Sequence, residues 1–200
     1  DEPALEKAVA LLLQIEKTVV EGAGAAGLAA TSVAVAQTPA ASSKRAGLQL
    51  TRQWDKTFPQ SPRVTHRKVT FTNRYGIELA GDLYMPKSRG TSMPAIVVGG
   101  PFGAVKEQSS GLYAQVMAER GFVTVAFDGS FTGESGGQPR NIASPDINTE
   151  DFSAAVDFLG TRSLVDRERI GVIGICGSGS FAISAAKIDP RLKAIATVSM

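Results

Sequence analysis

Apolar and polar residues alternate along two stretches of the chain, residues 66–72 and residues 77–84. A period of two predicts strands with one buried face, and the segment Asn73-Arg-Tyr-Gly76 between them predicts a turn. This part of the chain should therefore form an antiparallel hairpin. Shorter and more continuously apolar runs predict further strands at residues 94–98, 122–127, 169–175 and 193–198.

Helices are predicted in the segments between the later strands. Residues 111–120 stop at Gly121, residues 149–160 begin at a capping residue, Thr149, and residues 178–188 follow a glycine-rich corner. Strands that alternate with helices of about ten residues predict parallel βαβ units. We therefore expect an α/β fold with a mixed, mostly parallel sheet, which is led by the hairpin and covered by helices on both faces.

The beginning of the chain differs from the rest. Residues 1–20 have apolar side chains at a three-four spacing, which predicts an amphipathic helix, and residues 22–43 are uncharged and rich in Ala, Gly and Ser. Ala34-Val35-Ala36 matches the A-x-A pattern of a signal-peptidase site, so this segment is either a flexible linker or a former export signal. We predict a division into residues 1–47 and residues 48–200, without a stable membrane span. The location would be exported or periplasmic if that site is used, and cytoplasmic otherwise.

Charge and residue usage exclude several classes of function. The 200 residues carry a formal net charge of +2, their basic residues are scattered and Trp54 is the only tryptophan, so no nucleic-acid surface is predicted. Cys176 is the only cysteine and His66 the only histidine, which excludes an internal disulfide and a Cys/His zinc site within these residues. We expect no metal and no organic cofactor.

The sequence Gly-Ile-Cys-Gly-Ser-Gly at residues 174–179 lies between a predicted strand and a predicted helix, and it has three interpretations. A dinucleotide-binding turn would need a carboxylate at the end of the next strand, and residues 193–200 have none. A nucleophile elbow has the pattern small-x-nucleophile-x-small, which Cys176 fits with Gly174 and Ser178 as the small neighbours. The third interpretation is a small buried cysteine beside a tight turn.

The residue types favour Cys176 as the nucleophile of such an elbow. Ser178 also has small residues at both second neighbours, but it should already lie in the first turn of the helix. A helix N-terminus favours the reactive thiolate form of a cysteine. The carboxyl end of a central parallel strand is also where open α/β sheets bind their ligands, which favours an elbow over a purely structural cysteine.

Four motifs occur in order between about residue 63 and residue 200. They are the end of the hairpin, the loops after the third and fourth strands and the segment before the glycine-rich corner: Gly81-Asp-Leu-Tyr-Met-Pro86, Gly99-Gly-Pro-Phe-Gly-Ala-Val-Lys-Glu-Gln108, Asp128-Gly-Ser-Phe-Thr-Gly-Glu-Ser135 and Val165-Asp-Arg-Glu-Arg-Ile-Gly171. Together they resemble the α/β-hydrolase superfamily, and more closely its dienelactone-hydrolase-like and YcjY-like branch. The resemblance implies a hydrolase that acts on a small-molecule carboxylic ester or lactone.

The resemblance also implies roles for residues of this sequence. Cys176 corresponds to the nucleophile, the backbone N–H of Gly177 to one oxyanion donor and that of Phe102 to the other. Gly174 and Ser178 are the small neighbours that the elbow needs.

Polar residues of the two loops are expected to have structural roles only. Asp128 and Ser135 should brace the loop after the fourth strand. Lys106 and Glu107 should form a solvated pair on the surface.

An acid and a histidine should follow the nucleophile in chain order if the resemblance holds throughout. After Cys176 the sequence has one acid, Asp189, and no histidine, and His66 is expected to be an ordinary surface residue. We therefore expect a hydrolase sheet that is truncated after the sixth strand and has little activity alone. The alternative is a non-catalytic binding or scaffold protein. It would associate through its N-terminal helix and exposed sheet edge, as a homo-oligomer or with a complementing C-terminal chain.

Overall fold

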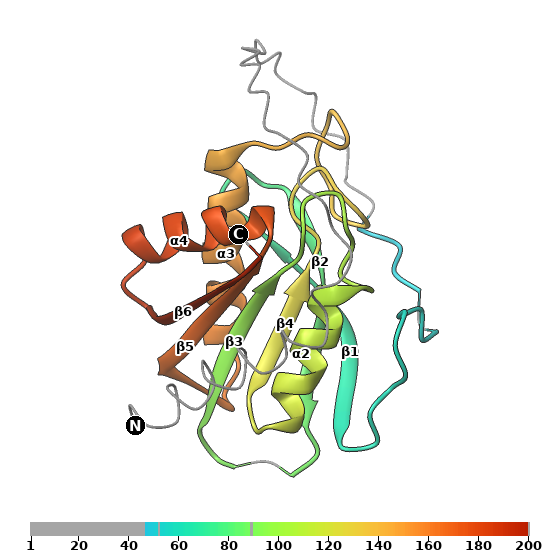
Figure 1. Cartoon of the computed structure of the whole chain (residues 1–200), viewed down its shortest axis with the longest axis vertical. Helices are drawn as coiled ribbons and strands as arrows, with labels where there is room; N and C mark the ends of the chain where they lie inside the picture. The colour runs from blue at the N-terminus through green and yellow to red at the C-terminus, as the bar shows by residue number, and fades with distance from the viewer. Residues whose placement is uncertain (1–46, 52, 89, 200) are drawn as a thin grey trace. The chain divides into compact units, whose positions relative to one another are not determined.

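The computed structural model describes residues 47–51, 53–88 and 90–199 (Figure 1). Leu48–Met200 form one compact unit. The amphipathic helix and the uncharged segment expected before residue 47 lie outside the described residues, so the division of the chain at that point stays a prediction.

The described residues build one six-stranded sheet, in the order β1-β2-β4-β3-β5-β6. β1 pairs antiparallel with β2, and β2 pairs antiparallel with β4, whereas β4, β3, β5 and β6 are parallel to one another. This arrangement confirms the predicted mixed, mostly parallel sheet led by a hairpin. The strands are β1 Val64–Thr72, β2 Glu78–Pro86, β3 Met93–Gly99, β4 Val123–Phe127, β5 Val165–Ile175 and β6 Leu192–Val198.

Helices pack on both faces of this sheet, as predicted (Figure 1). They are α2 Ser109–Glu119, α3 Pro145–Gly160 and α4 Gly177–Ile188. α2 contacts β2, β3 and β4, while α3 and α4 contact each other as well as β3 and β5. Within the described part of the chain, none of the helices combines the length and apolar character needed to cross a membrane.

Helix α3 begins one turn earlier than the predicted start at Thr149. Ser144 has extended backbone angles and Pro145 occupies the first turn of the helix. Proline suits this position because its ring presets a helical φ and its missing N–H would have no partner there. Thr149 lies within the helix and is buried instead of capping it.

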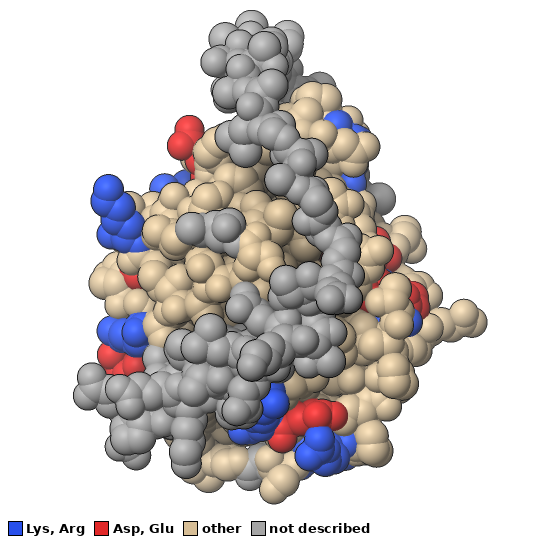
Figure 2. All heavy atoms as spheres, in the orientation of Figure 1, with Lys and Arg blue, Asp and Glu red and all other residues tan. Residues whose placement is uncertain are grey.

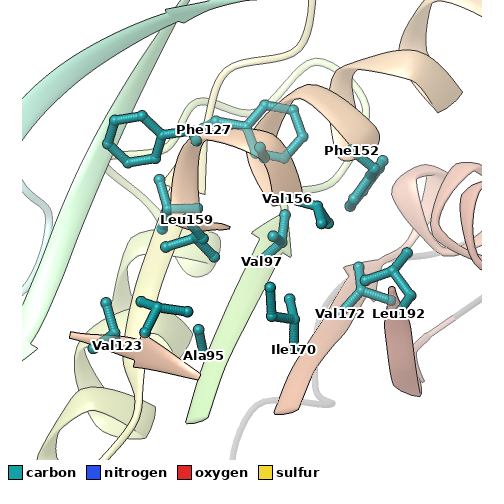
Figure 3. Close-up of a cluster of buried hydrophobic side chains, with 14 of the residues drawn as sticks. Ala95, Val97, Val123, Phe127, Phe152, Val156, Leu159, Ile170, Val172 and Leu192 are labelled. Carbon is teal, nitrogen blue, oxygen red and sulfur yellow. The ribbon is translucent and has the colours of Figure 1, made fainter. Parts of the chain in front are cut away.

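Aromatic rings fix α3 against the ends of the strands. Phe127, the last residue of β4, packs edge-on against Phe152 of α3 with ring centroids 5.2 Å apart, and Phe71 of β1 stacks on Phe158 at the same separation. Figure 3 shows Phe152 and Val156 among the buried side chains that α3 contributes to the core. Interdigitated packing of this kind is rigid. Helix α3 therefore has a fixed position next to the loops that follow β3 and β4.

The outer edge of the described sheet on the C-terminal side is β6. Ile195 on this strand is 42% exposed, and Ile183 and Ile188 of α4 are 41% and 65% exposed. Acidic and basic side chains are interspersed on the face shown in Figure 2. The expected association of this edge with a second copy or another chain stays a prediction.

Candidate active site

Cys176 occupies a strained turn between β5 and α4. Its φ of 54° and ψ of −124° lie in a region that residues other than glycine rarely adopt. The Cys176 N–H donates to the carbonyl oxygen of Val198 in β6 (2.8 Å), and its own carbonyl accepts from the N–H of Gly179 (2.9 Å). These bonds hold the backbone in place while the side chain is exposed. A strained residue whose side chain projects from a strand-to-helix turn is the geometry of a nucleophile elbow.

Gly174 has the small size that this turn requires. A Cβ at Gly174 would lie 2.6 Å from the carbonyl oxygen of Ser178 and 2.7 Å from the Cα of Gly179. These are backbone atoms, which cannot move without displacing the start of α4. Ser178 lies in the first turn of α4, with its Cβ 3.0 Å from where a Cβ of Gly99 would be. Its side chain therefore faces the end of β3, and the turn between strand and helix belongs to Cys176.

The loop after β3, residues 100–108, is called the β3 loop below. The N–H of Ala104 donates to the carbonyl oxygen of Pro101 (3.0 Å), and Gly103 has a φ of +84°. These features define a type II turn with Phe102 at its second position. The turn does not use the N–H of Phe102, and no acceptor for it exists among the described residues.

The β3 loop approaches the start of α4. A Cβ at Gly177 would lie 3.1 Å from the Cβ of Phe102 and 3.7 Å from its backbone nitrogen. Gly177 is the first residue of α4, so its own N–H has no carbonyl one turn earlier in the helix. Two free N–H groups therefore lie close together beside Cys176, an arrangement that can bind the oxygen of a polarised carbonyl group.

A pocket of about 40 Å³ lies between the β3 loop, the end of β4 and the start of α4. Its walls are mostly apolar and include four phenylalanine rings. The residues that line it include Gly100, Phe102, Phe127, Phe152, Ser178 and Phe181.

Asp151 of α3 is a buried carboxylate at this pocket, and no sequence pattern singled it out. It accepts hydrogen bonds from the backbone N–H of Ser130 (2.7 Å), from the Ser130 hydroxyl (2.8 Å) and from Nδ2 of Asn73 (2.8 Å). Burial raises the pKa of Asp151, although these hydrogen bonds act in the opposite direction. Its partners come from the β1–β2 turn and from the loop after β4, so Asp151 ties both segments to α3.

A cluster of charged side chains lies beside the β3 loop, and we call it the lysine cluster. Its centre is Lys106, whose side chain has no exposed surface, so the prediction of a solvated Lys106–Glu107 pair was wrong. The β3 loop turns this side chain inward, where it meets carboxylates from the end of β4 and the following loop. The members are Lys56, Lys68, Lys106, Asp55, Asp82, Glu107, Asp128 and Glu134.

Asp128 and Ser135 brace the loop after β4, as predicted. The Asp128 carboxylate accepts hydrogen bonds from the backbone N–H groups of Lys106 (2.8 Å) and Glu134 (2.9 Å). The Ser135 hydroxyl donates to the carbonyl oxygen of Asp128 (2.6 Å) and accepts from the N–H of Ala80 (2.8 Å). The two residues thus join the β4 loop to β2 and to the β3 loop.

Burial and charge act in opposite directions on the Lys106–Asp128 pair. Burial by itself lowers the pKa of Lys106, but the charge and hydrogen bond of Asp128, together with the hydrogen bonds of Glu107 and Glu134, outweigh it, so the pKa is raised. Burial also raises the pKa of Asp128, against the effect of Lys106 and of two backbone N–H groups. The raised pKa of Lys106 favours an ionised pair, whereas the raised pKa of Asp128 favours a protonated carboxyl group. The 2.8 Å contact and the further hydrogen bonds to Asp128 favour the ionised pair at neutral pH.

His66 and Asp189 both lie away from Cys176. His66 is on β1, and β2, β4 and β3 separate that strand from β5. It is also partly buried, with Nε2 2.7 Å from Oδ1 of Asp82, so the prediction of an ordinary surface histidine was wrong. Asp189 follows the far end of α4 and pairs with Arg191 at 2.7 Å. The structure thus brings Cys176, Gly177, Phe102, Gly174 and Ser178 together, and it leaves this acid and this histidine elsewhere.

A mostly parallel sheet with helices on both faces, and a strained residue at the turn between a parallel strand and a helix, are the features of an α/β hydrolase. Comparison with protein families gives the particular family. The chain belongs to the family described as X-Pro dipeptidyl-peptidase (S15 family), whose model matches residues 75–200. The predicted resemblance to α/β hydrolases is confirmed.

Three curated relatives extend this result. The uncharacterised protein PA2218 of Pseudomonas aeruginosa is 65% identical over 191 residues, which are 92% of this chain and 52% of the relative. The uncharacterised protein YcjY of Escherichia coli is 48% identical over 140 residues, 68% of this chain and 46% of the relative. Thiohydrolase aneE of Aspergillus aculeatus is 37% identical over 134 residues, 67% of this chain and 41% of the relative. The chain thus spans about half the length of the curated relatives it matches.

Solved structures show the same fold. The crystal structure of PA2218 matches with a TM-score of 0.75 and 72% identity, over 76% of this chain and 48% of that one. The α/β hydrolase GrgF of a Penicillium species matches with a TM-score of 0.62 and 27% identity, over 66% of this chain and 45% of that one.

Proposed function

We propose that the protein hydrolyses a carboxylic ester, lactone or thioester, with Cys176 as the nucleophile. The observation that carries this proposal is the strained backbone conformation of Cys176. A positive φ is unusual for a cysteine, and here it coincides with an exposed thiol and two nearby unpaired N–H groups. A thiohydrolase among the relatives adds thioesters to the bond types to be tested.

The proposed reaction begins with attack of Cys176 Sγ on the carbonyl carbon of the substrate. A C–S bond forms, and the negative charge that develops on the carbonyl oxygen is stabilised by the N–H groups of Phe102 and Gly177. When the carbonyl re-forms, the bond to the leaving alcohol or thiol breaks, and the leaving group takes the proton that Cys176 gave up. Water then cleaves the acyl group from Cys176 and regenerates the thiol.

A histidine normally activates the nucleophile in this fold. His66 is the only histidine among these 200 residues, and it lies on β1, bonded to Asp82. We propose that the histidine that activates Cys176 is not one of these residues. Acyl transfer to Cys176 at mildly alkaline pH, where thiols ionise without a base, is the half-reaction that this chain should still perform.

Acyl transfer from an acetyl thioester tests this proposal. We expect one acetyl group per molecule by intact mass spectrometry, located on Cys176, and little further turnover because no base activates the water. The Cys176→Ala variant should take up none, and the matched Ser178→Ala variant should still be acetylated. Equal acetylation of wild type and Cys176→Ala would contradict the proposal.

A further inference from the structure

Lys106 connects the β3 loop to Asp128, the residue that follows β4. The loop consists of two successive turns, because Gln108 N–H donates to the carbonyl oxygen of Val105 (3.0 Å) just after the turn that contains Phe102. Phe102 and Lys106 hold the second positions of these turns. The N–H of Phe102 is left free, whereas the N–H of Lys106 is bonded to Asp128.

Asp128 holds Lys106 at two points. One carboxylate oxygen accepts the backbone N–H of Lys106 and the other accepts its Nζ, both at 2.8 Å. Neither side chain has exposed surface. Because one carboxylate binds both the main chain and the ammonium of the same residue, it fixes the position of the turn as well as its orientation.

Asp128 is itself held in place. It follows the last residue of β4, and its N–H donates to the carbonyl oxygen of Ala80 in β2 (3.0 Å). Gly133 has a φ of +51°, and a Cβ there would lie only 2.2 Å from Oδ2 of Asp128. The β4 loop therefore closes directly over the carboxylate. Glu134 from this loop completes the contact, with its Oε2 2.6 Å from Nζ of Lys106.

A buried ion pair of this kind is a weak source of stability, because desolvation cancels most of the attraction between the charges. Its hydrogen bonds are nevertheless directional, and they favour the arrangement of the β3 loop that the structure shows. The exact position of the β3 loop is important for the proposed reaction. A displacement of about 1 Å at a catalytic group can lower a rate by about a hundred-fold.

We infer that Lys106 is a positioning residue for the oxyanion donor at Phe102, acting through Asp128; this inference rests on the proposed function. Lys106 touches no reacting atom. It holds the second turn of the β3 loop so that the first turn presents the N–H of Phe102 next to that of Gly177. The lysine cluster is then part of the active-site framework, through the Lys106–Asp128 contact.

Two reactions of the same thiol separate positioning from general stability. Acetylation of Cys176 by a thioester develops an oxyanion, whereas alkylation by iodoacetamide displaces iodide and develops none. In the Lys106→Met variant we expect the ratio of the acetylation rate to the alkylation rate to fall by about ten- to a hundred-fold. If this variant does not fold, Asp128→Asn serves instead, because its amide cannot accept from both donors of Lys106, and the same direction is expected.

The matched control is Lys68→Met. Lys68 belongs to the lysine cluster and contacts Glu134 and Glu107, but its salt bridges do not include Asp128. Its rate ratio should stay near that of the wild type. A ratio that stays unchanged in Lys106→Met, including the case in which both rates fall equally, would overturn this inference and leave the proposed function standing. Alkylation without any acetylation of wild-type Cys176 would overturn the proposed function and this inference with it.

Discussion

Replacing Gly174 by alanine is expected to lower the free energy of unfolding by at least about 2 kcal/mol. The added Cβ would meet the carbonyl oxygen of Ser178 at 2.6 Å, the Cα of Gly179 at 2.7 Å and the Cβ of Ala182 at 2.9 Å. Two of these three atoms belong to the backbone of α4, so relief requires moving the helix away from β5. The elbow should open, and acyl transfer to Cys176 should be lost together with stability.

Chemical denaturation of the variant measures this effect. Gly160→Ala is the matched control, because a Cβ at this last residue of α3 has its nearest neighbour 4.0 Å away, at Nε of Arg167. Its stability should stay the same or rise slightly, since alanine is the better helix former. Equal stabilities of the two variants would show that Gly174 is not confined as the structure indicates.

Replacing Phe102 by proline is expected to slow acyl transfer to Cys176 by about a hundred-fold or more. Proline removes the backbone N–H that we propose as an oxyanion donor. Phe102 stands at the second position of a type II turn, the position at which proline is favoured, so the loop should keep its conformation.

Phe102→Ala is the control for the loss of the ring. The Phe102 side chain is 52% exposed, so alanine should cost little stability, and this variant keeps the N–H group. Thioester acetylation rates of the two variants then differ by the contribution of the N–H alone. If Phe102→Ala and Phe102→Pro were slowed equally, the ring and not the backbone would be the important group.

The strands of the sheet and the tight turn at Cys176 could be predicted because both depend on local patterns. Alternation at residues 66–72 and 77–84 defined the hairpin, and short apolar runs defined the parallel strands. The small residues around Cys176 indicated a tight turn, and the structure adds the positive φ that makes this turn strained.

The lysine cluster could not be predicted in this way. Lys106 and Glu107 have the composition of an exposed loop, and burial of Lys106 depends on carboxylates that are distant in sequence, such as Asp128 and Glu134. His66 was misjudged for the same reason, since its partner Asp82 lies across the hairpin. The start of α3 was missed because Thr149 and Pro145 both carry start signals, and the proline prevailed.

The central claim is that the thiol of Cys176 and the two N–H groups converge on one carbonyl. A crystal structure of the protein treated with a trifluoromethyl ketone tests it most directly, because thiolates add to such ketones and leave an oxyanion in place. We predict a bond from Cys176 Sγ to the former carbonyl carbon, with the oxygen about 2.7–3.1 Å from the backbone nitrogens of Phe102 and Gly177. An adduct on Ser178, or an oxygen turned into solvent away from both nitrogens, would contradict the account.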